Sequence, residues 1–467
     1  MDENTNRRPV NPRRKRRSKL QIFKETYLPI IIAAIALILI LVFIIGSITR
    51  AVQYHKIEVQ AQIEASESLA AEQLRQQEEA KRLLEEAEGL VRHFDYESAI
   101  SILHGFTGDL AQFAEINEKI TEYQQAADAL IPWNDPNQVP NLSFHQLVVD
   151  PSKAFSDPIY SNSYSKNYVT LEEFSRILQQ LYDNGYILVR LSDISAGTVK
   201  LPEGKKPIIF TQTNANYYTY MIDSDGDKLP DKDGAGFASK LVLDANGNLT
   251  CEMVDYSGQT VTGAYDLVPI LDAFVETHPD FSYKGAKATL AVSGFEGLFG
   301  HRTDDESRQH FGEEFWNTEV SALSSIVNAL RTSGYEIACY TFRNAAYGEM
   351  TAQQIQEDIE LWSNQVTPIL GIVDTLVFAK NSDIAVAKEA YSGEKFDILN
   401  QYHFANYIGF CADATPWYTA YDGYIRQGRI MVTGANLTQK PDMFTGMFDA
   451  ASVVDAVRTT TQPQQEG

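Results

Sequence analysis

Cysteine is scarce in this chain: Cys251, Cys339 and Cys411 are the only three, and they lie far apart. An odd, widely spaced set excludes a disulfide framework, and the lack of a Cys-x-x-Cys pair excludes a zinc knuckle. Cys339 and Cys411 stand within apolar runs typical of strands. We therefore expect buried free thiols there.

The chain also lacks the marks of a nucleophilic hydrolase. It contains no Gly-x-Ser-x-Gly turn, and its eight histidines stand beside no serine or cysteine in a recognisable catalytic motif. An activated nucleophile needs a base close to it, so this class of hydrolase is disfavoured.

Positive charge is scarce beyond residue 50. Residues 1–50 carry ten Lys or Arg and three Asp or Glu, which leaves 29 basic and 59 acidic residues in the rest, a net charge of −30. Such a surface repels phosphate backbones, so we expect no nucleic-acid partner. The same charge favours solubility near an anionic cell envelope.

One stretch, residues 27–48, has no charge at all. Its length suffices to cross about 30 Å of hydrocarbon. A cleavable signal peptide is the alternative, but the run is too long and no Ala-x-Ala-like site follows. Nine Lys or Arg in the preceding tail, residues 1–26, predict a single-pass protein of the cell membrane. The N-terminus is then cytoplasmic and the main domain extracytoplasmic.

Residues 49–130 are predicted to form a helical stalk and spacer. No Gly or Pro occurs between residues 51 and 88, which favours a long polar helix, and shorter amphipathic patterns follow. One of them resembles half of a tetratricopeptide-like pair. Pro and Asn mark residues 131–140 as a linker. Residues 459–467 are predicted to be a disordered tail.

From residue 141 onward, short apolar runs alternate with helical patterns. Eight runs are strand candidates: residues 141–149, 185–191, 206–212, 287–293, 334–340, 374–380, 406–412 and 428–434. Strand followed by helix, repeated this often, predicts an α/β fold with a parallel sheet. The number of strands favours a distorted (β/α) barrel.

Several segments of this region are similar in sequence to one enzyme family. They include FHQLVVDPSKAF, KKPIIFTQTNANYYTYM, HPDFSYKGAKATLAVSGFEGLFGHRT and LRTSGYEIACYTFRNAAYGEM. Together they resemble NodB-type polysaccharide deacetylases, carbohydrate esterase family 4, over residues 141–458. The resemblance implies a deacetylase-type barrel and, in active members, a divalent metal that helps to hydrolyse N-acetyl groups.

The departures fall on the positions that carry the chemistry. The family's Thr-Phe-Asp-Asp motif supplies a general base and a metal ligand, and its His-[Ser/Thr]-x-x-His motif supplies two more ligands. Thr211 and Thr341 keep the hydroxyl positions and fix the register. The four positions of the base and the ligands are occupied by Thr213, Asn214, Tyr340 and Asn344.

The groove motifs have drifted as well. Residues 378–381 read Phe-Ala-Lys-Asn where the family has a Tyr-Pro-Tyr-Gly-like run. Thr433 stands where the family's Arg-x-x-x-Asp-Gly segment has aspartate, and no late Leu-x-x-His motif is present.

These departures predict a protein without a catalytic metal and without deacetylase activity. Metal-assisted hydrolysis needs anionic or imidazole ligands and a base that takes the proton from water. Two alternatives stay open: an active deacetylase with a non-standard site, and a structural scaffold. Other residues that could hold a metal are His301, Asp304, Asp305 and His403, although their spacing matches no known motif.

The loop DSDGDKLPDKDG has the character of a cation site. Asp223, Asp225, Asp227 and Asp231 bring several hard oxygen ligands together, which suits Ca²⁺. The loop differs from an EF-hand at Lys228 and at residue 234. A solvated acidic loop is the alternative.

Aromatic residues predict a glycan-binding surface. Asn216, Tyr217 and Tyr218 follow the first motif at the end of a strand, where barrels form their sites, and are the expected substrate-binding residues. Other aromatic candidates are Tyr220, Trp417, Tyr418, Tyr421 and Tyr424. The expected partner is a cell-envelope polysaccharide or peptidoglycan, or a protein of envelope assembly.

Overall fold

The computed structural model describes residues 18–460. The chain forms two compact units, and the boundary lies between Arg82 and Leu83. The first unit contains α1 (Lys19–Ile22), the π-helical turn η1 (Phe23–Tyr27) and most of α2 (Leu28–Val91). In the described part of the chain, the continuous helical run Lys19–Val91 is the one helix long and apolar enough to cross a membrane. Residues 1–17 of the predicted basic tail and 461–467 of the predicted C-terminal tail lie outside the described residues.

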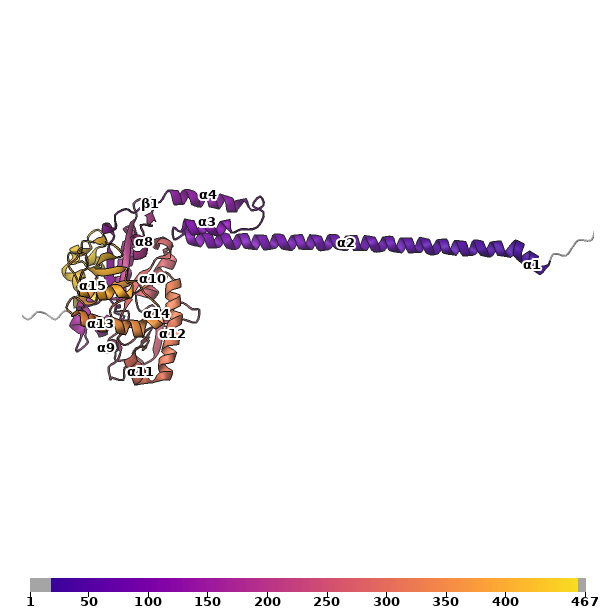
Figure 1. Cartoon of the computed structure of the whole chain (residues 1–467). Coiled ribbons are helices and arrows are strands. Elements are labelled where there is room, and N and C mark those ends of the chain that lie inside the picture. The colour runs from indigo at the N-terminus through magenta and orange to yellow at the C-terminus, as the bar shows by residue number, and fades with distance from the viewer. Residues whose placement is uncertain (1–17, 461–467) are drawn as a thin grey trace, which may run out of the picture. The chain divides into compact units, whose positions relative to one another are not determined.

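The second unit begins with the end of α2 and a helical hairpin. Helices α3 (Tyr96–His104) and α4 (Ala114–Asp128) lie side by side (Figure 1). The segment before α3 is fixed to the loop that leads into the barrel strand β9. The backbone N–H of Lys284 donates to the carbonyl of His93 at 2.7 Å, and Lys284 Nζ bonds to Glu97 at 3.0 Å. The hairpin is therefore attached at the amino end of a barrel strand.

Seven parallel strands form a closed barrel. Every neighbouring pair around the ring is hydrogen-bonded in parallel, and the β12–β14 pairing closes it. In ring order the strands are β2 (Asn141–Phe144), β5 (Lys206–Thr213), β9 (Ala288–Val292), β10 (Glu336–Cys339), β11 (Thr375–Val377), β12 (Asn406–Phe410) and β14 (Ile425–Met431).

Each of the eight predicted runs contains a strand, but one of them lies outside the ring. β3 (Tyr186–Leu188) pairs only with the first half of β5. Three other pieces were not predicted. β1 (Ile131–Pro132), in the predicted linker, pairs with β4 (Lys200–Leu201), and β13 (Tyr418–Ala420) pairs antiparallel with β14. A separate antiparallel sheet consists of β6 (Lys240–Leu243), β7 (Leu249–Val254) and β8 (Thr260–Gly263).

Helices follow most barrel strands, and their apolar faces pack on the strands' outer side chains. In α7 (Leu171–Asp183) the buried residues are spaced three or four apart, and Thr170 with Glu173 forms a capping box at its start. The larger helices of this layer are α10 (Leu267–Thr277), α12 (Glu313–Thr332) and α13 (Ala352–Leu361). The shorter ones are α5 (Pro151–Ala154), α6 (Ser161–Asn167), α8 (Leu191–Ser195), α9 (Thr219–Ile222), α11 (Asp305–Phe311), α14 (Thr367–Leu370), α15 (Glu394–Leu399), α16 (Gly434–Gln439), α17 (Ala450–Val453) and α18 (Ala456–Thr460).

The side chains alternate between a helix-covered outside and a packed interior. One core cluster contains outward residues of the strands together with the helices, for example Phe210 and Leu290. The intervening residues of the same strands form a second cluster: Ile209, Ala291, Ala338, Val377 and Ile408. Polar side chains also lie inside the ring, where Thr211 donates to Asn141 at 2.8 Å and Asn141 donates to Gln427 at 3.1 Å. The barrel is a filled core without a channel.

Candidate functional site at the carboxyl ends of the strands

The structure brings the first and second motifs to one end of the barrel. Thr213 ends β5 and Tyr340 directly follows β10, with β9 between these two strands. All three strands run in the same direction, so their carboxyl ends lie at the same edge. Thr213 is fully buried and Tyr340 is 3% exposed. The carboxyl ends of β5 and β10 are therefore closed by two buried side chains.

His145, which directly follows β2, is a neighbour that sequence reasoning missed. Its Nδ1 lies 2.9 Å from the hydroxyl of Thr213, which also donates to the carbonyl of Phe144 at 3.2 Å. Burial, reinforced by the positive charge of Arg429, lowers the pKa of His145 to about 4. An imidazole this weakly basic, next to a buried hydroxyl, is a poor general base at neutral pH.

Arg429 places a buried positive charge at the same end of the barrel. Its guanidinium is fully buried beside Tyr340 and donates to Phe378 O at 2.8 Å, Gly409 O at 2.9 Å and Asn381 Oδ1 at 3.1 Å. No carboxylate pairs with it in residues 18–460. Its Nε is buried and has no hydrogen-bond partner there. The charge of Arg429 is thus held mainly by neutral carbonyl dipoles.

The loops around this end follow strained backbone paths. Asn214, Thr341, Asn344 and Asn381 have φ angles of 57°, 64°, 51° and 56°, in the left-handed region that side chains disfavour. The β-branched Thr341 is the least favourable of them, and its hydroxyl accepts from the N–H of Ala345 at 2.7 Å. Strain of this kind clusters at binding and catalytic sites.

Asp358 of α13 holds the loop that carries the second motif. Its carboxylate accepts from the N–H groups of Phe342 at 2.7 Å and Arg343 at 3.1 Å, and from the hydroxyl of Tyr347 at 2.9 Å. Asp358 is fully buried. Its place on an ordinary amphipathic helix gave no sign of this role in the sequence.

The residues at this end do not fit a divalent metal. Threonine, asparagine and tyrosine offer neutral oxygens, and the cation of Arg429 lies next to one of the positions. Across residues 18–460, His, Cys, Asp and Glu side chains gather closely enough for a metal at one place, Asp223, Asp225 and Asp227. We therefore derive no catalytic step through a metal at the barrel.

The alternative ligands named from the sequence are dispersed. His301 faces the carbonyl of Leu241 through Nε2 at 3.0 Å and the carboxylate of Glu319 through Nδ1 at 3.2 Å. Asp304 caps α11, and Asp305 begins that helix. His403 lies after the short helix that ends at Tyr402. They do not form a ligand cluster in the described part of the chain.

The three predicted substrate-binding residues are buried and bonded within the protein. Asn216 joins the loops after β5 and β9 by bonding to both backbone groups of Ser293, and Tyr217 donates to Asp266 at 2.6 Å. Tyr218 donates to Asn214 at 3.1 Å. Their exposed fractions are 0%, 1% and 5%. Their placement corrects the sequence-based expectation in one respect, because none of the three presents an exposed face for a sugar.

Neighbouring aromatic residues do present exposed faces. Tyr160, Tyr220 and Phe295 are 38%, 42% and 41% exposed, and we call them the aromatic shelf. The rings of Tyr160 and Tyr220 are 5.2 Å apart, and Tyr218 stacks on Tyr220 at 6.0 Å. The ring of Phe295 lies 6.2 Å from that of Tyr218. The buried Tyr218 thus supports an exposed apolar surface after β5 and β9.

The remaining predicted positions lie elsewhere. Thr433 caps the start of α16 and accepts from the N–H of Asn436 at 3.1 Å. Trp417 is 4% exposed, while Tyr418 is half-buried in β13. Tyr421 and Tyr424 stack on each other at 4.9 Å. These aromatic residues belong to the β12–β14 side of the barrel.

The acidic loop gathers three of its four predicted ligands. Oxygen atoms of Asp223, Asp225 and Asp227 lie within 4.8 Å of one another. Asp231 instead accepts from the N–H and the hydroxyl of Ser224, both at 2.7 Å. Asp223 accepts from three backbone N–H groups of its own loop. The carboxylates are therefore held together by backbone bonds.

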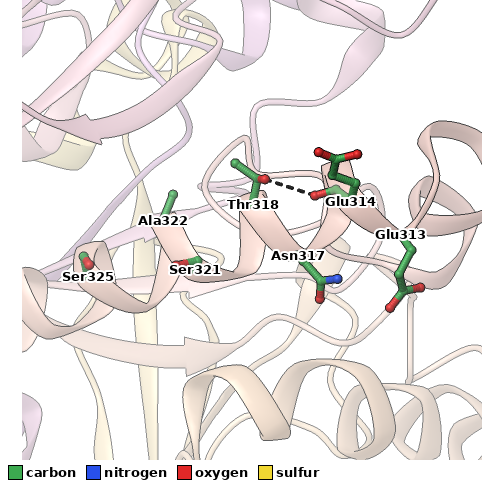
Figure 2. A pocket seen from close by; sticks show the side chains of 7 residues that line it. All are labelled: Glu313, Glu314, Asn317, Thr318, Ser321, Ala322 and Ser325. Carbon is green, nitrogen blue, oxygen red and sulfur yellow. Dashed lines mark hydrogen bonds between the residues drawn. The ribbon is translucent and has the colours of Figure 1, made fainter.

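A hollow of about 830 Å³ lies along one exposed face of α12 (Figure 2). All of its lining residues come from this single helix, and the hydroxyl of Thr318 bonds back to the carbonyl of Glu314 at 3.0 Å. It is a shallow surface depression without convergent charges from a second element. Nothing in it indicates chemistry.

Comparison with known proteins gives distant similarities. No protein-family model and no curated protein matches the chain. The structure is similar to that of the Streptococcus pyogenes deacetylase PplD in complex with acetate, at 13% identity and a TM-score of 0.37, over 65% of this chain and 95% of that one. It is also similar to a de-N-acetylase from Aggregatibacter actinomycetemcomitans, at 10% identity and a TM-score of 0.35, over 66% and 99% of the two chains.

Proposed function

We propose that this chain is a membrane-anchored, extracytoplasmic protein with a deacetylase-like barrel that binds a cell-envelope glycan without hydrolysing it. The observation that carries the proposal is the set of side chains at the carboxyl ends of the barrel strands. Thr213, Asn214, Tyr340 and Asn344 offer only neutral hydroxyl and amide groups, which make a poor ligand set for a divalent cation. These four positions therefore provide neither a general base nor metal ligands for the hydrolysis of an N-acetyl group.

The aromatic shelf supports the binding half of the proposal. Flat rings present apolar faces that pack against the C–H groups of sugar rings. Tyr220 and Phe295 both contact Tyr218, which is bonded to Asn214 of the first motif. The shelf therefore adjoins the place where the barrel type builds its groove.

Acetate release tests the loss of catalysis. The full-length protein, purified in a detergent without sugar groups, should release no acetate from N-acetylglucosamine oligomers, with or without added Zn²⁺ or Co²⁺. Elemental analysis should find no transition metal held at the barrel. Acetate release that a chelator abolishes would overturn this part of the proposal.

Variants of the shelf test the binding. Tyr220→Ala and Phe295→Ala should each weaken binding of N-acetylglucosamine oligomers by roughly tenfold, about 1.4 kcal/mol. Tyr256→Ala removes another exposed tyrosine, at the β7–β8 turn, and should have no effect. Calorimetric titration measures all three.

A scaffold is the second candidate, and one observation favours it. The mouth is filled, since Thr213 and Tyr340 are buried and Tyr340 belongs to the interior cluster. If the wild-type protein binds no glycan, the scaffold becomes the better account. In that case the partner is a protein of envelope assembly.

A further inference from the structure

A second hollow, of about 360 Å³, lies beside the carboxyl ends of β11 and β12. Its volume falls within the range of small-molecule sites, ~300–1,000 Å³. None of Thr213, Asn214, Tyr340 and Asn344 lines it, whereas Asn381 of the drifted groove motif does. Loops that follow three consecutive barrel strands contribute its residues, and we call it the Asp383 pocket: Gly348, Asn381, Ser382, Asp383, Phe410 and Trp417.

Two glycines on neighbouring strands make room for the pocket's polar side chains. Gly409 and Gly428 are register partners on β12 and β14. A Cβ on Gly409 would lie 2.7 Å from Asp383 Oδ2, and one on Gly428 would lie 2.2 Å from Trp417 Nε1. Any other residue would displace these groups. Because these two glycines have no side chain, the carboxylate of Asp383 and the indole of Trp417 can lie close to the strands.

The carboxylate of Asp383 is fixed, and its charge is compensated. It accepts from Arg426 Nη2 at 2.7 Å and from the hydroxyl of Tyr391 at 2.8 Å, and the guanidinium lies 4.1 Å from the centre of the Tyr391 ring. Arg426 is fully buried. A carboxylate offers about four acceptor positions. The N–H of Ala385 takes a third at 3.4 Å, which leaves one for a ligand.

Trp417 supplies a donor without a partner. Its side chain is 4% exposed and lines the pocket, yet its indole N–H makes no hydrogen bond within residues 18–460. The nitrogen is not among the fully buried side-chain atoms that lack a partner, so solvent or a ligand can reach it. The hydroxyl of Ser382 and the amide of Asn381 line the same hollow, and Phe410 adds an apolar wall. The pocket thus combines aromatic faces, donors and acceptors with a compensated charge.

We infer that the Asp383 pocket binds one neutral sugar unit of a glycan. A sugar ring offers hydroxyl groups that both donate and accept, together with an apolar face for the aromatic walls. An anionic ligand would meet the carboxylate of Asp383, and a cation would meet the buried charge of Arg426. The inference rests on the proposed glycan-binding function, and it adds a site separate from the aromatic shelf.

Ligand-observed NMR with monosaccharides tests the inference. The probes are N-acetylglucosamine, glucose and the anionic glucuronate, added to the full-length protein in a detergent without sugar groups. Wild-type protein should bind the two neutral sugars and bind glucuronate more weakly. Ser382→Ala and Trp417→Phe each remove one hydrogen-bonding group and should weaken binding by ~3–10-fold.

Two further variants control for folding and position. Gly348→Ala places a Cβ 2.4 Å from the carbonyl oxygen of Asp383 and 2.7 Å from Ser382 Oγ, so it should displace this part of the pocket's lining and weaken binding. Ser321→Ala removes a hydroxyl from the depression on α12 and should change nothing (Figure 2). Thermal melting of each variant shows whether it is folded.

The outcomes separate this inference from the proposed function. If monosaccharide binding is lost in Tyr220→Ala and Phe295→Ala but kept in Ser382→Ala, Trp417→Phe and Gly348→Ala, the pocket is overturned and the shelf stands. If oligomers bind but monosaccharides do not, the pocket holds water only and the inference fails. Tighter binding of glucuronate overturns the neutral class. If no glycan binds at all, the proposed function fails as well.

Discussion

The guanidinium of Arg429 has a consequence for any attempt to build a metal site at this end of the barrel. It lies beside Tyr340 and lowers the pKa of His145, so its charge acts on the place where a metal would be held. A like charge in a site of low dielectric costs several kcal/mol, because little water is present to screen it. New ligands alone would leave this cost in place.

Restoring the four motif residues should therefore give only weak metal binding. We expect the Thr213→Asp, Asn214→Asp, Tyr340→His and Asn344→His combination to bind Zn²⁺ at least ~tenfold more weakly than the same combination with Arg429→Met added. Calorimetric titration with Zn²⁺ compares the two. Equal affinities would show that Arg429 does not oppose the cation.

The pKa of His145 gives a second prediction at this scale. Its imidazole has a pKa of about 4 in the folded protein and of 6.5 when freely solvated, as in the unfolded chain, so the unfolded chain holds more protons between these values. The stability that His145 contributes is therefore fully present above pH 6.5. The free energy of unfolding falls as the pH drops from 6.5 to 4, by up to about 3 kcal/mol, and solvent screening at the exposed edge of the ring reduces this amount.

Urea denaturation over this pH range measures the effect. His145→Asn cannot titrate there and should show a shallower loss of stability than the wild type. His310→Asn, at an exposed position on α11, should follow the wild type. Parallel curves for all three proteins would refute the assignment to His145.

Among the elements, the last helix is held by a buried ion pair. Arg458 of α18 bonds to Glu173 of α7 through Nε at 2.8 Å and Nη2 at 2.7 Å, and the two side chains are 4% and 0% exposed. Removing one partner leaves the other charge buried without compensation, so Arg458→Met should cost roughly 3–5 kcal/mol of unfolding free energy. The double variant with Glu173→Met should recover much of that loss.

Chemical denaturation measures this cycle. Lys232→Met breaks the exposed pair with Asp233 and should change stability by less than ~1 kcal/mol. If Arg458→Met is as harmless as Lys232→Met, the pair does not hold the helix.

The acidic loop between α9 and β6 carries the calcium prediction. Millimolar Ca²⁺ should raise the melting temperature, and ligand at ~100 times its dissociation constant adds about 2.7 kcal/mol. Asp225→Asn together with Asp227→Asn should abolish the shift, because two of the three gathered carboxylates are then neutral. Asp244→Asn, in the β6–β7 turn, is the control. A melting curve that Ca²⁺ does not move leaves the solvated acidic loop as the account.

The elements show how far the sequence determined the fold. The barrel strands were predictable because each is a short apolar run bounded by polar residues. β3 has the same pattern, and only its register with β5 places it outside the ring. The β6–β8 sheet was missed, although the Asn246-Gly247 pair between β6 and β7 is a recognised hairpin signal.

The sequence located the candidate site but not its contents. Thr213 and Tyr340 could be placed at one end of the barrel because both stand at the ends of predicted strands. The burial of Tyr217 could not be predicted, since Tyr220, three residues later, has the same side chain and the fold alone decides which ring is covered. Likewise, the sequence places Arg429 in a motif but does not reveal that its guanidinium is fully buried and held by backbone carbonyls.

For the whole molecule, the charge distribution predicts the topology. The tail before the span is basic and the chain beyond residue 50 carries a net charge of −30, so the N-terminus should stay in the cytoplasm. Alkaline phosphatase fused after residue 467 should be active in cells, and green fluorescent protein at the same place should be dark. Changing Arg13, Arg14, Arg16 and Arg17 to Glu should reverse the membrane orientation of part of the protein molecules. An active fluorescent fusion in the unaltered chain would contradict the predicted topology.

The attachment of the helical hairpin at the amino end of β9 has a mechanical meaning. A pull along the chain from α2 enters the barrel at His93, which is bonded to Lys284 just before that strand. β9 is paired in register with β5 on one side and β10 on the other. Load along the strand must therefore shear both ladders together and cannot open them one bond at a time. The hairpin thus contacts the barrel at the amino end of β9, and the loops that carry the motif residues lie at the opposite end, away from this attachment.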